Sequence, residues 1–258
     1  MVNLFKTLVA TACASIVWGG VAVRFATAAA PSTAPAELVS TLAAIEAAAN
    51  AQDIEQLMAL YSSDFAGPDG FTREQYQATL SEFWTQYSTL TYDVELLSWE
   101  NEGVVLVAET LTTVAGTRQV VDRPMQLTAE VRSRQRYADG QLISQEILTE
   151  TSRLTSGPMP PEVTIQLEPT VLPGSQFPFD AIVEAPLGNR LLLGLAFDEG
   201  VTAEDFLTPR PVDLEALSAG GLFKIGTAPK TNDQRWISAV LVRSDGMIID
   251  TRRLNVQR

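Results

Sequence analysis

The sequence lacks histidine and has a single cysteine, and these two deficits exclude several kinds of catalytic site. Without histidine there is no Ser-His or Cys-His nucleophile pair, no imidazole general base and no imidazole ligand for zinc or haem. The cysteine, Cys13, lies in an apolar N-terminal segment, so the rest of the chain has no thiol nucleophile, disulfide or thiolate metal site. We therefore expect no metal and no other cofactor.

Basic residues are also scarce. The chain has 18 Lys and Arg against 31 Asp and Glu, a formal net charge of -13. The first 28 residues contain Lys6 and Arg24 and no acid, so the remainder is more acidic still. Because binding to nucleic acid or anionic lipid requires clustered cations, we expect no nucleic-acid partner.

Residues 1–28 have the layout of an export signal. A short basic start, Met1–Lys6, precedes a run without charge, residues 7–23, and Ala26-Thr27-Ala28 forms a small-residue cleavage site. We expect the protein to be exported, to a periplasmic or extracellular location. Arg24 lies between the apolar run and the cleavage site, which fits an uncleaved membrane tether through residues 7–23 instead. Lipid modification of Cys13 is a weaker alternative.

Three helices are predicted before residue 88. Apolar residues recur at helical spacing over 36–52. Asp53 with Gln56 begins a second helix that carries Ile54, Leu57, Met58 and Tyr61, and Thr72 with Gln75 begins a third. The segment Gly67–Gly70 between the last two contains Gly-Pro-Asp-Gly and predicts a turn.

After Ser88 the hydrophobic period becomes two, which predicts strands. Turns are expected at Asn101–Gly103, Ala115–Gly116 and Ala138–Gly140. The strands between them are residues 91–99, 104–113, 119–122, 125–137 and 141–153. The last two are long enough to curve around helices.

A proline-rich segment, Ser156–Pro161, predicts a stiff connector between two domains. The first domain is residues 36–156. The second, residues 162–258, shows six or seven short strands and no convincing helix, which favours an all-β sandwich of immunoglobulin-like type.

The first half resembles the nuclear transport factor 2-like superfamily. The resemblance is carried by the Ala-rich helix, the stretch Asp53–Phe65, the Phe83-Trp84 helix and four strands of alternating pattern, over residues 36–156. It implies an α+β cone, with N-terminal helices on a curved antiparallel sheet and a pocket between the third helix and the concave face. Enzymatic members of the family place an acid, a tyrosine or an Asp-Arg-Asp set there. The family's early acidic position corresponds at best to Asp64 or Asp69.

Glu109 is the carboxylate of most interest. If it shares the inward face of its strand with Val105, Val107 and Leu111, it is a buried acid suited to general acid or base catalysis. If Leu106 and Ala108 face inward instead, Glu109 faces water. Both faces of this strand are apolar, so both alternatives stay open.

Three aromatic residues, Tyr61, Trp84 and Tyr87, are candidates to line a pocket with Glu109 for a flat or apolar ligand. The alternative is that they are ordinary core residues.

A row of arginines, Arg132, Arg134 and Arg136, alternates on one face of a strand and could clamp a carboxylate. The alternative is cross-strand pairing, with Arg132 opposite Glu146 and with Glu130 and Glu150 nearby. An acidic loop, Asp198–Glu199 with Glu204–Asp205, is a weak candidate for a calcium site, and its spacing matches no known calcium loop.

Together these observations favour an exported, non-catalytic protein of two domains that binds a small apolar ligand or a protein partner. Two alternatives stay open. One is a small enzyme of isomerase or hydrolase type that uses Glu109 or Asp69 with a tyrosine. The other is a structural homodimer.

Overall fold

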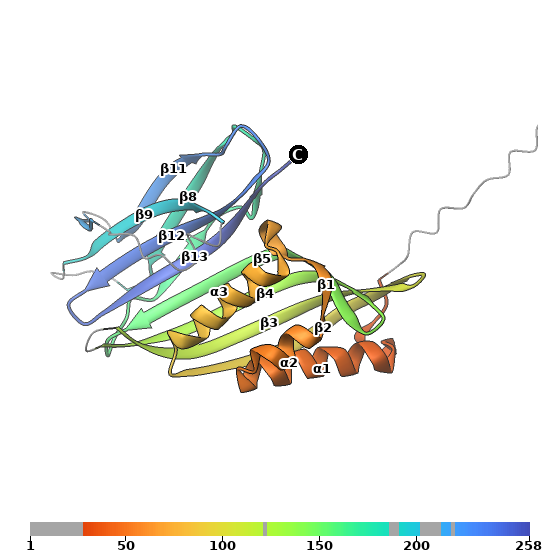
Figure 1. Cartoon of the computed structure of the whole chain (residues 1–258). Coiled ribbons are helices and arrows are strands. Elements are labelled where there is room, and N and C mark those ends of the chain that lie inside the picture. The colour runs from red at the N-terminus through yellow and green to blue at the C-terminus, as the bar shows by residue number, and fades with distance from the viewer. Residues whose placement is uncertain (1–27, 121–122, 186–190, 202–212, 218–219) are drawn as a thin grey trace, which may run out of the picture.

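The structure is a computed structural model that describes residues 28–120, 123–185, 191–201, 213–217 and 220–258 (Figure 1). The first half contains η1 Pro31–Thr33, α1 Ala36–Ala51, α2 Ile54–Ala59, β1 Tyr61–Ala66, η2 Pro68–Gly70, α3 Arg73–Thr85, β2 Thr89–Glu102, β3 Val105–Val120, β4 Arg123–Ala138 and β5 Gln141–Ser156. The second half contains β6 Val163–Gln166, β7 Thr170–Val171, β8 Gln176–Val183, β9 Leu193–Gly200, β10 Glu215–Ala216, β11 Gly221–Thr227, β12 Asp233–Arg243 and β13 Gly246–Val256. The predicted leader lies outside the described residues except for Ala28.

The two predicted helix caps are confirmed. The Asp53 carboxylate accepts a hydrogen bond of 2.9 Å from the backbone N–H of Gln56 at the start of α2. At the start of α3, Thr72 and Gln75 form a reciprocal capping box. Each cap satisfies backbone N–H groups that have no partner within the helix, so the caps fix where the helices begin.

The predicted extent of the second helix is wrong, because α2 ends at Ala59 and Tyr61 begins strand β1. This strand pairs in parallel with β5, with Tyr61 opposite Leu142. Tyr61 and Phe65 are both buried. Positions i and i+4 share a face in a helix and in a strand alike, so their spacing could not distinguish the two.

The turn predicted at Ala115–Gly116 is also wrong, because β3 runs unbroken through both residues. Gly116 lies opposite Leu90 of β2. A Cβ atom at Gly116 would come within 2.8 Å of the Thr89 carbonyl oxygen and 2.7 Å of a Leu90 methyl carbon. The glycine therefore permits close approach of two strands and does not mark a turn.

Two bulges alter the predicted pairing of β4 with β5. The hairpin turn has two residues, Asp139 and Gly140, both with positive φ, so Ala138 pairs with Gln141. Next, Tyr137 pairs with Leu142 and Arg136 with Ser144, so β5 has one extra residue there and Glu146 lies opposite Arg134, not Arg132 as predicted. A second extra residue follows Glu146, because Ser133 pairs with Ile147 and Arg132 with Thr149. Because an extra residue reverses which face later side chains occupy, Glu150 lies on the face away from the arginine row.

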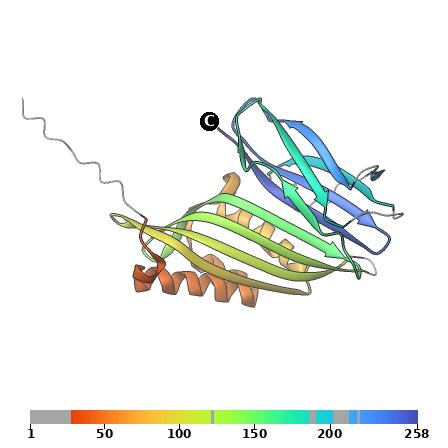
Figure 2. The same ribbon diagram turned by 180° about the vertical axis from the view of Figure 1, so that it is seen from behind.

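The helices cover one face of a curved antiparallel sheet and enclose the first hydrophobic core (Figure 1). Seen from behind, the sheet presents a face over which no described helix lies (Figure 2). The core combines residues of the helices and of the helix-facing side of the sheet: Leu38, Leu42, Leu57, Met58, Trp84, Ala108, Leu127 and Leu142. Residues 36–156 thus form an α+β cone, with N-terminal helices on a curved antiparallel sheet, which is the fold that the resemblance implied.

The second half continues the sheet of the first. The long sheet has the order β10-β9-β12-β13-β5-β4-β3-β2, so the C-terminal strand β13 pairs directly with β5. The pairing runs antiparallel, from Met247 opposite Ser156 to Arg252 opposite Thr151. A second sheet, β11-β8-β6, packs on β9, β12 and β13 around a separate core that includes Phe179, Leu241 and Ile248. Within the described residues, no helix has both the length and the apolar character to cross a membrane.

All five tyrosines of the chain lie in the cone, and burial raises the pKa of each. Burial raises the pKa of Tyr61 well above its ordinary value, with further contributions from Tyr76 and Tyr137. Burial raises the pKa of Tyr92 to about 12, although a hydrogen bond from Trp84 partly offsets the effect. A phenolate inside this core would lose its hydration, and even at Tyr87, where Arg118 lowers the pKa, the effect of burial is larger.

The raised pKa values predict how the cone responds to alkali. A group whose pKa is raised on folding stabilises the protein below its unfolded pKa, here about 10, and this stabilisation is lost as the pH rises through the folded value. We expect tyrosinate absorbance at 295 nm to appear in the native protein only well above pH 10, together with unfolding. The same chain in concentrated urea should titrate near pH 10. Identical titration curves in the two solvents would contradict a closed aromatic core.

Candidate functional site

The interior of the cone is filled by the aromatic residues predicted to line a pocket. Tyr61, Trp84 and Tyr87 are 5%, 6% and 8% exposed and belong to the first core. The Trp84 indole N–H donates to the Tyr92 hydroxyl at 2.9 Å. The Tyr61 ring packs edge-on against the Phe65 ring, with 4.8 Å between the ring centroids. The first contact satisfies the polar group of Trp84 within the protein, and the second is the ring packing of an ordinary core.

Glu109 is separated from these aromatics by the thickness of the sheet. Its neighbours Ala108 and Thr110 are fully buried, and Ala108 packs in the core beneath the helices. Because side chains alternate along a strand, Glu109 points to the opposite face. There its carboxylate forms an ion pair with the Arg132 guanidinium. Of the four residues predicted to line the pocket, the structure therefore brings three together and leaves Glu109 outside.

The arginine row is paired with glutamates from β3, which is adjacent to β4, and from β2 beyond it. Besides the Arg132–Glu109 pair, Arg136 lies 2.6 Å from Glu102, and Arg134 lies 3.5 Å from Glu100. The partners come from β2 and β3, whereas the sequence predicted pairing with β5. Each arginine thus already has a carboxylate close by.

Asp69 joins the cone to the second half of the chain. It lies in η2 with a φ of 55°, an uncommon backbone conformation for a residue other than glycine. The Arg253 guanidinium donates to both carboxylate oxygens of Asp69, at 2.7 and 2.8 Å. Such a two-pronged contact is the strongest geometry for an arginine and a carboxylate.

Arg253 is the centre of this network. Its side chain is 2% exposed, and it also donates to Glu150 at 3.0 Å. The Trp236 indole N–H donates to the same carboxylate at 3.0 Å. Burial alone would lower the pKa of Arg253, but hydrogen bonding and charge from Asp69 and Glu150 outweigh it and raise the pKa. Asp69 and Arg253 are 184 positions apart, so no sequence spacing could have associated them.

A second ionic cluster lies near the same strand pair. The Asp250 side chain is 1% exposed and contacts Arg153 of β5 at 2.8 Å and Arg252 at 2.7 Å. Asp250 and Arg253 are three positions apart on β13, so their side chains occupy opposite faces of the sheet. Ionic contacts therefore connect the two halves on both faces.

The acidic loop of the second half is only partly described. Asp198 and Glu199 lie within β9, and Asp198 is 2.6 Å from Arg235. Glu204 and Asp205 lie outside the described residues. Among the residues with a described position, no cluster of three or more acids, histidines or cysteines could hold a metal ion.

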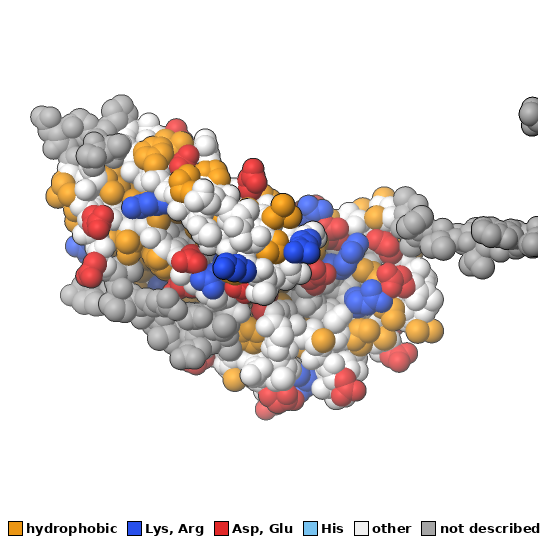
Figure 3. Space-filling view, turned by 90° about the horizontal axis from the view of Figure 1, so that it is seen from above, with side chains coloured by type: hydrophobic (Ala, Val, Ile, Leu, Met, Phe, Trp, Pro, Cys, Tyr) orange, Lys and Arg blue, Asp and Glu red, His pale blue; other side chains and the backbone are white. Residues whose placement is uncertain are grey.

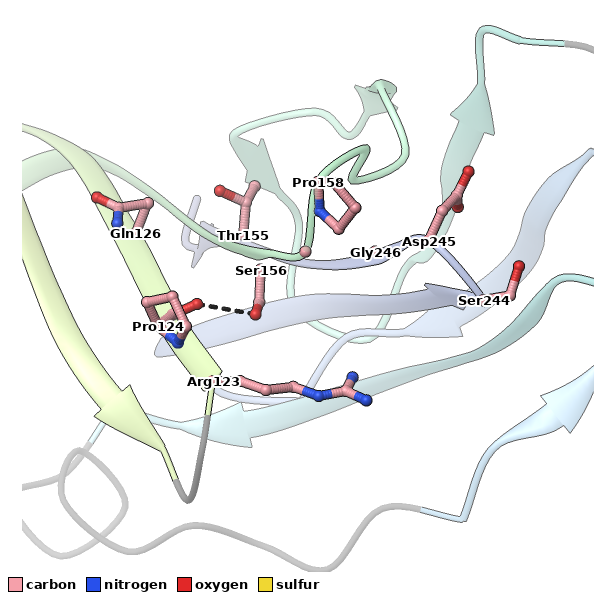
Figure 4. Close-up of a pocket in the computed structure, with 10 residues that line it drawn as sticks. Arg123, Pro124, Gln126, Thr155, Ser156, Pro158, Ser244, Asp245 and Gly246 are labelled. Atoms are coloured by element: carbon pink, nitrogen blue, oxygen red, sulfur yellow. Dashed lines mark hydrogen bonds between the residues drawn. The ribbon is translucent and has the colours of Figure 1, made fainter.

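A cavity of about 550 Å³ lies where the two halves meet (Figure 4). Its volume is within the range of small-molecule sites. The lining comes from the start of β4, the end of β5, the connector and the β12–β13 turn: Arg123, Pro124, Gln126, Thr155, Ser156, Gly157, Pro158, Ser244, Asp245 and Gly246. None of the four predicted pocket residues is among them. Strand pairing between segments that are distant in the sequence creates this cavity, so no local sequence motif predicts it.

The walls of the cavity are held by close backbone contacts. The Met159 N–H donates to the Asp245 carbonyl at 3.0 Å, and Arg243 donates to the Met159 carbonyl at 2.8 Å. A Cβ atom on Gly246 would lie 2.6 Å from the Cα of Pro160. Ser156 also donates to the Pro124 carbonyl at 2.8 Å (Figure 4). The cavity is therefore largely formed before any ligand arrives, which lowers the entropic cost of binding.

One family model matches part of the second half of the chain. Residues 158–257 match the family described as "Domain of unknown function (DUF8623)". No curated protein matches the chain.

Similar solved structures align with less than half of the chain. An uncharacterized cystatin fold protein from Novosphingobium aromaticivorans is 15% identical, with 44% of this chain and 98% of that chain covered and a TM-score of 0.31. An LEH-like epoxide hydrolase from Mycobacterium tuberculosis is 14% identical, with 43% and 80% covered and a TM-score of 0.30. For Bd1075 of Bdellovibrio bacteriovorus the identity is 15%, the TM-score is 0.33, and the alignment spans 43% of this chain but 38% of Bd1075.

The Arg253 network predicts a large effect of one substitution. Arg253→Gln leaves two mostly buried carboxylates without their cation, and breaking a buried ion pair in this way costs about 3–5 kcal/mol. The matched control is Arg132→Gln, whose side chain is 49% exposed and whose loss should cost less than about 1 kcal/mol. Urea unfolding measures both free energies. Equal destabilisation by the two substitutions would show that the network does not hold the halves together.

Proposed function

We propose that this protein is an exported, non-catalytic binding and interaction protein. The observation that best supports this is the state of its two candidate catalytic acids. Asp69 forms an ion pair with Arg253, and Glu109 forms one with Arg132. A general acid or base must be within reach of a substrate and free to exchange a proton. Two carboxylates that are ion-paired with arginines fit structural roles better than catalytic ones.

The binding site that we propose is the cavity at the junction of the two halves, for a small ligand or for part of a protein partner. The aromatic interior of the cone is less suitable, because Tyr61, Trp84 and Tyr87 are already packed within the first hydrophobic core. The cone would then serve as a rigid support. For the alternative of a homodimer formed through the uncovered face of the sheet, the row of ion pairs on that face offers little apolar area.

We also propose that the second half is a β-sandwich of immunoglobulin-like type that serves as an interaction module. Its strand orders support this. If β6, β8 and β11 correspond to strands A, B and E, and β9, β12 and β13 to C, F and G, the orders β6-β8-β11 and β9-β12-β13 are those of the two immunoglobulin sheets. No described strand corresponds to strand D.

The surface seen from above carries acidic and basic side chains next to one another, without a large area of one sign (Figure 3).

Export is proposed from the sequence of the leader. Cleavage after Ala28 would leave Ala29, whose backbone exchanges hydrogen bonds of 2.8 and 3.2 Å with Trp99 at the edge of the sheet. We expect the mature protein, recovered from the medium or the periplasm, to have the intact mass of a chain that begins at Ala29. A mass that still includes residues 1–28 would favour the membrane tether and contradict cleavage.

The binding role predicts stabilisation by ligands without turnover. A ligand present at 100 times its Kd should raise the free energy of unfolding by about 2.7 kcal/mol, which appears as a higher melting temperature. We would screen the purified protein against small organic acids, sugars, lipids and envelope extracts by thermal denaturation.

Two outcomes of this screen would contradict the proposal. One is that nothing raises the melting temperature. The other is consumption of a stabilising compound at a rate that Asp69→Asn or Glu109→Gln abolishes while each variant still folds, because that result would make the protein an enzyme.

A further inference from the structure

One end of the long sheet is strand β2, and helix α1 lies alongside it (Figure 1). β3 pairs with β2 on one side, and no described strand lies on the other. With 14 residues β2 is long for an edge strand, since strands commonly have about 5–6. A long edge presents N–H and C=O groups that can pair with another chain, and native proteins usually protect such edges. The contacts along β2 show how this one is protected.

Asn50, near the end of α1, bonds to the backbone of β2 as a residue of a neighbouring strand would. Its side-chain Nδ2 donates to the Tyr92 carbonyl at 2.9 Å, and its Oδ1 accepts from the Tyr92 N–H at 2.8 Å. In an antiparallel ladder, two backbone residues that form a hydrogen-bonded pair exchange the same two bonds. The Asn50 amide therefore takes the place of one residue of a strand that is not there.

Glu46, one helical turn earlier, occupies the next position along the edge. Its carboxylate accepts from the Val94 N–H at 3.0 Å. Four residues of a helix rise about 6 Å, and two residues of a strand rise about 6.7 Å. Side chains four apart lie on one face of a helix, and alternate residues of a strand direct their backbone groups to the same edge. The spacing of Glu46 and Asn50 thus matches that of Val94 and Tyr92.

The far part of the edge is covered in another way. The backbone of Ala29 exchanges hydrogen bonds of 2.8 and 3.2 Å with Trp99. A bulge at Leu97 interrupts the regular strand between the two covered regions, and a bulge twists an edge away from regular pairing. Asp93 and Glu95 are exposed on β2 and would repel the same residues of a second copy.

We infer that Asn50, Glu46 and Ala29 form an edge shield, which prevents β2 from pairing with β2 of a second copy of this chain. A two-fold axis would place the two strands antiparallel, and each would satisfy the backbone groups that the shield now occupies. Backbone hydrogen bonds do not depend on the sequence of the partner strand, so other copies of the chain are sufficient partners. This role concerns self-association and does not depend on the proposed binding function.

Removing the two helix side chains tests the shield. The variant Glu46→Ala/Asn50→Ala should keep α1, because alanine has the highest helix propensity. In sedimentation velocity of the purified exported protein, we expect the mass of wild type to stay constant with concentration. The mass of the variant should rise toward twice that value. Loss of one hydrogen bond should speed amide exchange at Tyr92 and Val94 by about tenfold in dilute variant. At high concentration, pairing of the β2 strands should slow this exchange again.

Three further variants serve as controls, and circular dichroism verifies that each one folds. Glu46→Gln removes the charge but keeps an oxygen that can accept from Val94, so it should not associate. Asn232→Ala makes an asparagine-to-alanine change at an exposed position of the second half and should behave as wild type. Asn50 is itself exposed, so the single variant Asn50→Ala provides the same comparison if the double variant does not fold.

Several results would overturn the inference. A folded double variant with the mass of wild type at every concentration would mean that β2 is protected without the shield. Equal exchange rates at Tyr92 and Val94 in dilute wild type and variant would mean that the shield contacts do not form in solution. Association without renewed protection of these two amides would place the new interface elsewhere. Association of Glu46→Gln would assign the effect to lost charge.

Discussion

The pairing of β5 with β13 is the interaction on which the rest of this structure depends. Six residue pairs join the last strand of the cone to the last strand of the chain. Without this pairing both strands would expose a row of unsatisfied N–H and C=O groups along one edge, a state that favours aggregation. The pairing converts two edges into the interior of one sheet. It also brings the connector and the β12–β13 turn against β4 and β5, and so creates the junction cavity.

Ionic contacts make the register of that pairing specific. Backbone hydrogen bonds alone tolerate a slip of the strands, whereas Arg253 reaches Asp69 and Glu150 only in one register. Asp250 meets Arg153 on the opposite face in the same register. Withdrawing these groups from water is costly, and only the paired arrangement compensates for that cost. A buried arginine between two acids therefore acts mainly as a selector of one alignment, with a smaller net gain in stability.

Several features of the fold were predictable because their physical causes are local. Caps at Asp53 and Thr72 follow from residues three positions apart, and the long strands after Ser88 follow from alternation of apolar side chains. Local reasoning failed where one pattern had two physical meanings. The glycine at position 116 suggests a turn, but in the structure it permits two strands to pack closely. The spacing of Tyr61 and Phe65 fits a helix and a strand equally. The bulge at Leu148 leaves no mark in the periodicity, yet it places Glu146 and Glu150 on opposite faces, whereas a regular strand would place both on one face.

The sequence by itself determined the chemistry that is available: with no histidine and with its one cysteine in the predicted leader, the chain offers carboxylates, arginines, tyrosines and hydroxyls. It also determined the cone, because helix caps and strand periodicity act over a few residues. Tertiary structure alone decided how these groups are used. It turned Glu109 away from the aromatics and joined Asp69 to Arg253. The physical reason is that the pairing partner of a strand, and so the surroundings of a charge, depends on contacts between segments far apart in the chain, such as Asp69 and Arg253 at 184 positions.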